Sequence, residues 1–257
     1  MRRIVATIAG GLCLGVLAGL LSRPASAADD PARALQPPKR ADFALAGASL
    51  VARGIADWVV DSGDNRGLPF VIVDKVDARV FVFHADGRLR GAAPALLGSA
   101  RGDDAVPGIG NRPLSSIRPE ERTTPAGRFE AALDRNLGGK EILWVDYDTA
   151  VSMHPVVTSN AVERRAERLA TETPLDNRIS FGCINVPAKF FESVVHPAFS
   201  GTNGIVYVLP ETRPAAKVFA SYDVGARTRA QAGGAIAGDK VASSAGAPVR
   251  VRKPGLP

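Results

Sequence analysis

The chain is poor in the residues that build disulfide frameworks and metal sites, with 2 cysteines and 3 histidines among 257 residues. Two cysteines make at most one bridge, so a disulfide-stapled scaffold is excluded and the fold must be stabilised by its own hydrophobic core. The histidines are scattered and form no His-x-x-x-His pattern, which argues against a zinc site. We therefore expect a protein that holds no metal.

Positive charge is also scarcer in the body of the chain than the formal net charge of +6 indicates. Residues 1–27 carry +3 and residues 224–257 carry +5, which leaves −2 for residues 28–223. Without a basic stripe interleaved with aromatic side chains, this body is not expected to bind nucleic acid. The basic C-terminal segment is rich in Ala, Gly and Ser and is typical of a solvated tail, with contact to an anionic wall or membrane surface as the alternative.

The first 27 residues have the pattern of a secretory signal peptide. Arg2 and Arg3 precede an apolar run over residues 4–21, and Ala25-Ser26-Ala27 forms an A-x-A cleavage site. An uncleaved anchor is the alternative, because the run is just long enough to span a bilayer. We expect cleavage, no transmembrane segment in the mature protein, and a periplasmic or other extracytoplasmic location.

Removal of the signal leaves Cys183 as the remaining cysteine, because Cys13 lies within the apolar run. An odd cysteine in an exported protein forms an intermolecular bridge or is a free reactive thiol, and we favour the thiol. Gly182 precedes it and allows a tight turn in which a substrate carbonyl can approach neighbouring N–H groups, as in an oxyanion site. A buried structural cysteine is the alternative.

Hydrophobic periodicity divides the mature chain into three parts. Residues 28–66 are interpreted as a proline-containing linker and an N-terminal helix that Ser49 caps, with Val51, Ile55, Trp58 and Val59 on its apolar face. Residues 67–212 form the predicted folded domain, and residues 213–257 a flexible basic tail.

Within the predicted domain, runs rich in Val, Ile and Phe between turn signals indicate antiparallel β architecture. The predicted strands cover residues 70–73, 79–83, 128–133, 141–147 and 204–210. A helix is expected before Cys183, where Asn160 and Glu163 have capping-box spacing, and another after it, opened by Pro187. The charged helix before Cys183 is either a lid over a site or a solvated insertion.

The segment Ser180-Phe181-Gly182-Cys183-Ile184-Asn185 resembles the active-site signature of the YkuD-like L,D-transpeptidases, cysteine enzymes of bacterial cell walls. The usual signature is Ser-His-Gly-Cys, an apolar residue, and Arg or Asn. Residues 124–129 match the family's Thr-Pro-x-Gly-x-Phe, and His154 precedes the cysteine as in the family. The resemblance covers residues 67–212. The chain departs from the family at Phe181, where the family has His, and at Pro155, where it usually has Gly.

The resemblance implies a mainly β fold, a β-sandwich of mixed sheets with a helix after the cysteine motif and a helical insertion before it. It implies that Cys183 attacks the bond before the terminal D-amino acid of a peptidoglycan tetrapeptide stem. His154 would hold the thiolate as an ion pair and protonate the departing D-alanine. The partner would be peptidoglycan stem peptides, and no metal or organic cofactor would be needed.

Further site residues follow from the same motif. The N–H groups of Gly182 and Cys183 are the expected oxyanion donors. Arg178 and Asn185 are expected to orient the stem's carboxylates or the motif loop, and Phe181 is included among the substrate-binding residues. Ser180 would either orient the catalytic histidine or fix the turn.

Other classes fit less well. A sortase-like enzyme would need an arginine shortly after the cysteine, and papain-like or NlpC/P60-like hydrolases place the cysteine before the histidine. His84 and His196 are interpreted as peripheral. Two alternatives stay open: a noncatalytic peptidoglycan-binding protein, which the loss of a proton-transferring histidine at Phe181 would produce, and a hydrolase (L,D-carboxypeptidase) in which water resolves the acyl-enzyme.

Overall fold

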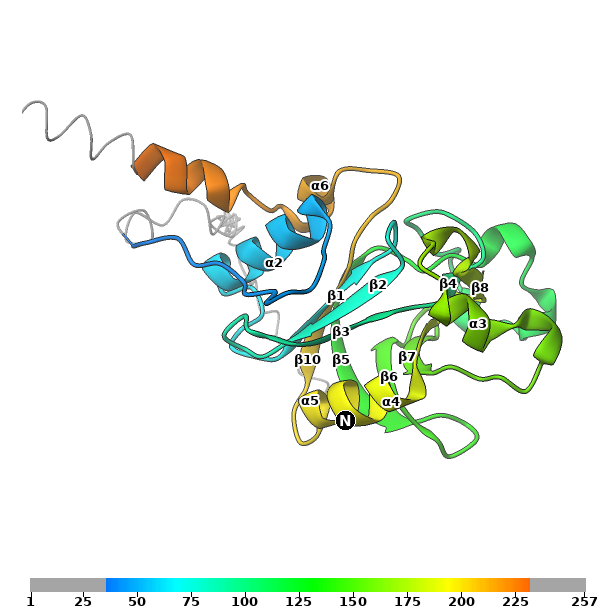
Figure 1. Ribbon diagram of the computed structural model, residues 1–257. Helices are drawn as coiled ribbons and strands as arrows, with labels where there is room; N and C mark the ends of the chain where they lie inside the picture. Colours follow the sequence, from blue (N-terminus) through cyan, green and yellow to red (C-terminus); the bar gives the residue numbers. More distant parts are fainter. Residues whose placement is uncertain (1–35, 232–257) are drawn as a thin grey trace, which may run out of the picture.

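The computed structural model describes residues 36–231. The expected signal peptide and residues 232–257 of the expected tail lie outside this range. The strands of the described part form an eight-stranded sheet in the order β3-β2-β1-β10-β5-β6-β7-β9 and a two-stranded sheet of β4 and β8 (Figure 1). The strands are β1 (Phe70–Asp74), β2 (Arg79–Phe83), β3 (Leu89–Pro94), β4 (Leu97–Gly98), β5 (Gly127–Arg135), β6 (Glu141–Asp146), β7 (Val151–Pro155), β8 (Arg178–Ser180), β9 (Ile184–Val186) and β10 (Gly204–Val208).

The predicted mainly β fold with mixed pairing is confirmed. The antiparallel pattern read from the strand runs is wrong for three pairs, because β1–β10, β7–β9 and β4–β8 are parallel. The main strands also form one continuous sheet instead of two separate ones. Its two halves curve toward each other, since Val80 and Val82 of β2 share a hydrophobic cluster with Met153 of β7 and Ile184 of β9.

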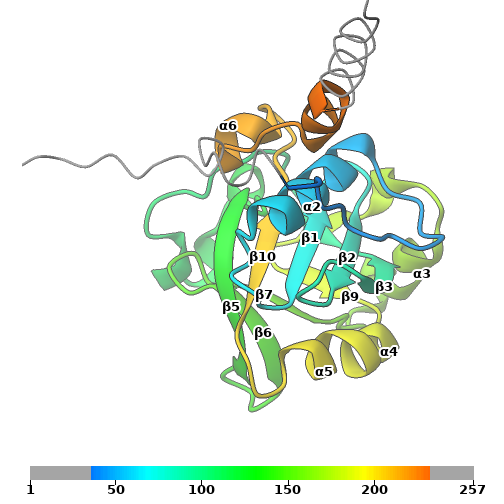
Figure 2. The same ribbon diagram turned by 90° about the vertical axis from the view of Figure 1, so that its left-hand side faces the viewer.

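The half of the sheet around β1 is buried on both faces. Neighbouring side chains of a strand point to opposite faces, so they enter two different clusters. Val71 and Val73 face the cluster inside the curved sheet, whereas Phe70 and Ile72 face helix α2 (Leu50–Ser62). Figure 2 shows α2 over the strands β1 and β10. Burial on both faces explains why this strand is a continuous apolar run.

Helix α2 follows the sequence signals closely. The Ser49 side chain accepts a hydrogen bond from the Ala52 N–H, and Gly63 ends the helix with φ of 72°. Its buried face includes Ile55, Trp58 and Val59 as expected, but Val51 is half-exposed.

As predicted, a helix follows the cysteine motif, and the structure packs it inside the curved sheet. It runs through α4 (Ala188–Phe190), a π-helical turn η7 (Phe191–Val195) and α5 (His196–Phe199). Phe191, Val195 and Phe199 are buried in the same cluster as the inner faces of β1 and β7.

The helical insertion before the motif is more broken than predicted. It contains the 3-10 turns η5 (Ala161–Glu163) and η6 (Pro174–Asp176) around α3 (Arg165–Ala170). Asn160 accepts a hydrogen bond from the Val162 N–H, as a capping residue does, but Arg164 then adopts a left-handed conformation and interrupts the helix. Val162 is consequently exposed.

The segments flanking the predicted domain also pack against it. Phe43, expected in a linker, is buried and contacts Phe81 and Phe83 edge-on. Residues 213–231, expected in a loose tail, contain α6 (Ala215–Phe219) and a helical segment over 224–231, with Phe219 and Val224 buried in the cluster under α2. Apolar side chains thus hold both segments to the sheet. Among the described helices, none has the length and hydrophobicity needed to cross a membrane.

A fully buried ionic network links the loops that surround the cysteine motif. Lys75, at the end of β1, has no exposed side-chain surface and donates from Nζ to the carbonyls of Gly102 (2.5 Å) and Thr124 (3.0 Å) and to Asp103 Oδ1 (2.8 Å). Asp103 also accepts hydrogen bonds from the Glu211 N–H (2.8 Å). The network therefore joins four segments distant in sequence.

Candidate active site

The sheet brings His154 and the cysteine motif together. Strands β7 and β9 pair in parallel with His154 opposite Asn185, and Cys183 lies just before β9. Because side chains alternate along a strand, Ser152 and His154 share one face of β7 while Met153 enters the core. The candidate nucleophile and the candidate base thus lie on, or next to, adjacent strands.

The turn before Cys183 requires glycine. Gly182 has φ of 134°, and a Cβ atom there would lie 2.7 Å from the Thr123 carbonyl oxygen. The Ser180 hydroxyl donates to the Cys183 carbonyl (2.6 Å) and accepts from the Gly182 N–H (3.1 Å). Thr124 Oγ1 donates to the Gly182 carbonyl at 2.8 Å. These bonds fix the turn in one conformation.

Of the two roles expected for Ser180, these hydrogen bonds correspond to fixing the turn. The Gly182 N–H, one of the two expected oxyanion donors, donates to the Ser180 hydroxyl in this structure. The Cys183 N–H has no hydrogen-bond partner within residues 36–231, so it is the backbone donor left for an oxyanion.

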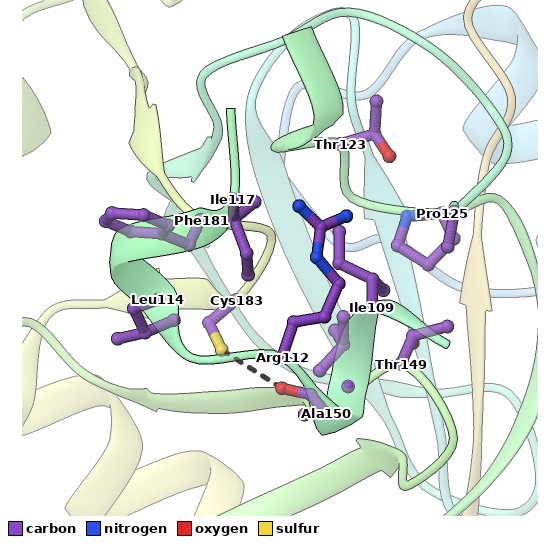
Figure 3. A pocket seen from close by; sticks show the side chains of 13 residues that line it. Ile109, Arg112, Leu114, Ile117, Thr123, Pro125, Thr149, Ala150, Phe181 and Cys183 are labelled. Carbon is purple, nitrogen blue, oxygen red and sulfur yellow. Dashed lines mark hydrogen bonds between the residues drawn. The ribbon is translucent and has the colours of Figure 1, made fainter. Parts of the chain in front are cut away.

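The Cys183 thiol is free and partly exposed, and its sulfur lies 3.6 Å from Ser152 Oγ. It also lies 3.7 Å from the Ala150 carbonyl oxygen (Figure 3). Burial would raise the pKa of the thiol, but hydrogen bonding and charge from His154, with hydrogen bonds from Ser152, lower its pKa below the ordinary value. The site thus favours the thiolate, which is the nucleophilic form.

His154 shows the opposite shift. Burial would lower its pKa, but the hydrogen bond and charge of Cys183 raise its pKa overall, so each group stabilises the charged form of the other. Nδ1 lies 2.8 Å from the Pro155 carbonyl, and Nε2 lies 3.2 Å from Asn185 Nδ2. The imidazole is held on both sides.

Cys183 opens into a cavity of about 120 Å³ whose wall is mainly the loop between β4 and β5 (Figure 3). Ile109, Leu114 and Ile117 give this wall an apolar character. Phe181 lines the same cavity, and the Arg122 guanidinium lies 4.0 Å from the centroid of its ring. An apolar ring therefore stands beside the thiol where the resembling family has an imidazole.

The remaining motif residues are occupied within the protein. Arg178 forms an ion pair with Glu211 (2.6 Å) and donates to the Lys75 carbonyl, and it does not line the cavity. Asn185 is buried and contacts His154 and the Cys183 carbonyl. Both side chains thus contact residues of the protein itself in this structure.

The other histidines lie apart from the thiol. His84 is exposed next to a turn, and His196 pairs with Glu141 at 3.2 Å. In the described part of the chain no three His, Cys, Asp or Glu side chains are grouped to hold a metal ion.

Sequence reasoning missed two residues of this site. Ser152 had a readable signal, because it is a polar residue two positions before His154 in an otherwise apolar strand, which places both on one face. Arg165 had none: its Nη1 donates to Asn185 Oδ1 at 2.6 Å across a contact that only the fold creates.

No protein-family model matches the chain, and no curated protein matches it. Solved structures with a similar fold include the helical cell shape determining protein Pgp2 from Campylobacter jejuni, at 15% identity and a TM-score of 0.37 over 63% of this chain and 52% of that one. An L,D-transpeptidase from Xylanimonas cellulosilytica has 14% identity and a TM-score of 0.35 over 55% of this chain and 60% of that one.

An L,D-transpeptidase from Mycobacterium tuberculosis is similar at 15% identity with a TM-score of 0.33, over 55% of this chain and 57% of that one. The chain thus spans between 52% and 60% of the length of these three structures. At these identities and TM-scores the likeness assigns no activity to the chain.

Proposed function

We propose that the protein is a cysteine acyltransferase of the L,D-transpeptidase kind that acts on peptidoglycan stem peptides outside the cytoplasm. The observation that carries the proposal is the Cys183–His154 pair, in which each group favours the charged form of the other beside an open cavity. The resemblance of residues 180–185 to the family signature supports the choice of substrate.

In the first step, Cys183 Sγ bonds to the carbonyl carbon of the stem's bond to its terminal D-amino acid. The C=O electron pair moves to oxygen, which would accept a hydrogen bond from the Cys183 N–H. When the C–N bond breaks, the leaving nitrogen takes its electron pair and a proton from His154 Nε2. A thioester and a free D-amino acid result.

In the second step, an acceptor amine attacks the thioester carbonyl and gives one proton to His154 Nε2, and the thiolate leaves. The imidazolium and thiolate are then restored, so the cycle is balanced. Water in place of the amine would give hydrolysis. Phe181 carries no proton in either step, and this scheme needs a single imidazole.

The test is to incubate purified protein with tetrapeptide muropeptides and measure the intact mass of the protein together with the low-mass products. We expect a transient acyl-enzyme, released D-alanine and a cross-linked dimer with the wild type. All three should be absent with Cys183→Ser. His154→Gln should also be inactive, whereas the matched variant His84→Gln should keep activity because that ring is exposed and distant from the motif.

The outcomes separate the candidate activities. D-alanine release without a dimer would mean that the protein is an L,D-carboxypeptidase. If wild type and Cys183→Ser both bind the muropeptide and neither releases D-alanine, the acyltransferase proposal fails and the protein is a peptidoglycan-binding module.

A further inference from the structure

The helical insertion between His154 and Cys183 reaches back to the catalytic base through two side chains. Arg165, the first residue of α3, donates from Nη1 to Asn185 Oδ1 at 2.6 Å, and Asn185 Nδ2 lies 3.2 Å from His154 Nε2. Arg165 and Asn185 are 20 residues apart in sequence. In Figure 1, α3 lies beside β8, on the side of the molecule that carries the motif.

The hydrogen-bond roles in this chain follow from Arg165. A guanidinium can only donate, so the Asn185 atom that it contacts must be the oxygen. The amide nitrogen must then face His154, and because that nitrogen also only donates, Nε2 must accept. The proton of the neutral ring therefore sits on Nδ1, which donates to the Pro155 carbonyl at 2.8 Å.

We infer that Arg165 is a positioning residue, supplied by the insertion, which fixes the Asn185 amide and thereby keeps His154 Nε2 as the proton acceptor. This inference rests on the proposed function, in which Nε2 moves the proton. Without Arg165 the Asn185 amide keeps only the longer hydrogen bond from Nδ2 to the Cys183 carbonyl (3.4 Å) against turning its oxygen toward Nε2. The turned arrangement suits the protonated ring and hinders its return to the base form.

The position of Arg165 is itself fixed. Its Nε donates to Glu163 Oε2 at 2.5 Å, and 13% of its side chain is exposed. Arg164 next to it is 70% exposed and pairs with Glu167, so the insertion offers a neighbouring arginine with no contact to Asn185.

Several charged groups face His154. Cys183, in the turn before β9, raises the pKa of His154 through its hydrogen bond and charge. Arg165, on α3, lowers the pKa of His154 through its positive charge. Lys140 and Glu141, at the start of β6, line a cavity of about 450 Å³ together with His154. Since Lys140 and Glu141 carry opposite charges, Arg165 is the cation whose loss is expected to alter the ring most.

The test is histidine NMR in the Cys183→Ser background, where no thiol titrates with the ring and no turnover occurs. Long-range 15N–1H correlation gives the tautomer of His154 and its titration gives the pKa, with His154→Gln for assignment. We expect the Nδ1–H tautomer in the parent and in the control Arg164→Met. Arg165→Met should populate both tautomers and raise the His154 pKa by about one unit, because a nearby positive charge and a fixed donor are lost.

In the active protein, Arg165→Met should lower kcat about tenfold with KM unchanged, since a misplaced base affects proton transfer. Arg165→Lys, which keeps the charge and a donor, should restore the parent tautomer. If Arg165→Met does not fold, Arg165→Gln replaces it and should raise the pKa with the tautomer kept. A tautomer and pKa equal to those of Arg164→Met would overturn the inference, and this result is independent of whether D-alanine is released.

Discussion

Replacing Lys75 by methionine tests the buried network that supports the motif. Methionine keeps the length of the side chain but removes the ammonium group from a site with no solvent access. Asp103, whose side chain is also without exposed surface, then loses its closest cation, and the carbonyls of Gly102 and Thr124 lose a donor. Breaking one side of a buried ion pair costs about 3–5 kcal/mol because the partner charge stays buried.

A loss of this size is a large fraction of the stability of a single domain. At about 2–4 °C per kcal/mol for a domain of this length, the melting temperature should fall by about 10 °C. Guanidinium unfolding followed by tryptophan fluorescence measures the loss, since Trp58 is buried in the core. Lys189→Met is the matched control, because Lys189 is exposed on α4 and its loss should leave the midpoint unchanged.

The pH dependence of the free energy of unfolding tests the same ion pair between Lys75 and Asp103. Burial raises the pKa of Asp103, but hydrogen bonds from Lys75, Thr212 and the backbone outweigh it and hold the pKa far below its usual value. A carboxylate with a depressed pKa in the folded state stabilises the protein above its unfolded-state pKa, and this stabilisation is lost as pH falls. The difference between wild type and Lys75→Met should therefore shrink below about pH 4. A difference under about 1 kcal/mol at neutral pH would refute the reasoning.

Three further changes test the site itself. Gly182→Ala should destabilise the motif turn by about 1–3 kcal/mol and abolish activity, because φ of 134° and the Thr123 carbonyl at 2.7 Å leave no room for a Cβ; thermal unfolding and D-alanine release measure both effects. Alkylation of Cys183 by iodoacetamide should persist to lower pH than alkylation of a free thiol. His154→Gln should move this pH profile of alkylation to higher pH, because it removes the group that lowers the thiol pKa. An unchanged profile would contradict the pairing of His154 with Cys183. Phe181→Ala should raise KM and leave that alkylation profile in place, as expected for a residue of the cavity wall.

Local signals made much of the fold predictable. A serine cap, an apolar face and a glycine end define α2, and β-branched and aromatic runs mark the strands. The parallel pairing of Phe70 with Ile205 was not readable, because it joins segments separated by most of the domain. The inner helix had clear signals, whereas the break at Arg164 in the insertion had none.

The candidate site was also predictable only in part. Residue type and order predicted that Cys183 and His154 belong to one site, and the sequence also showed the need for glycine before Cys183. The roles of the side chains between them depend on tertiary contacts. Lys75 lies in an Asp-Lys-Val-Asp sequence that is typical of an exposed turn, and its burial follows from four segments that meet only in the folded chain.

The parallel pairing of β7 with β9 has a consequence for how this site can vary. Parallel neighbours cannot be joined by a tight turn, so a crossover segment must run between His154 and Cys183. The strand pairing sets His154 opposite Asn185, and the crossover itself carries Arg165 and Ser180, whose side chains contact Asn185 and the motif turn. Residues 157–160 of this crossover are exposed, so an insertion there should leave the pairing of β7 with β9 and the contacts of Arg165 and Ser180 in place.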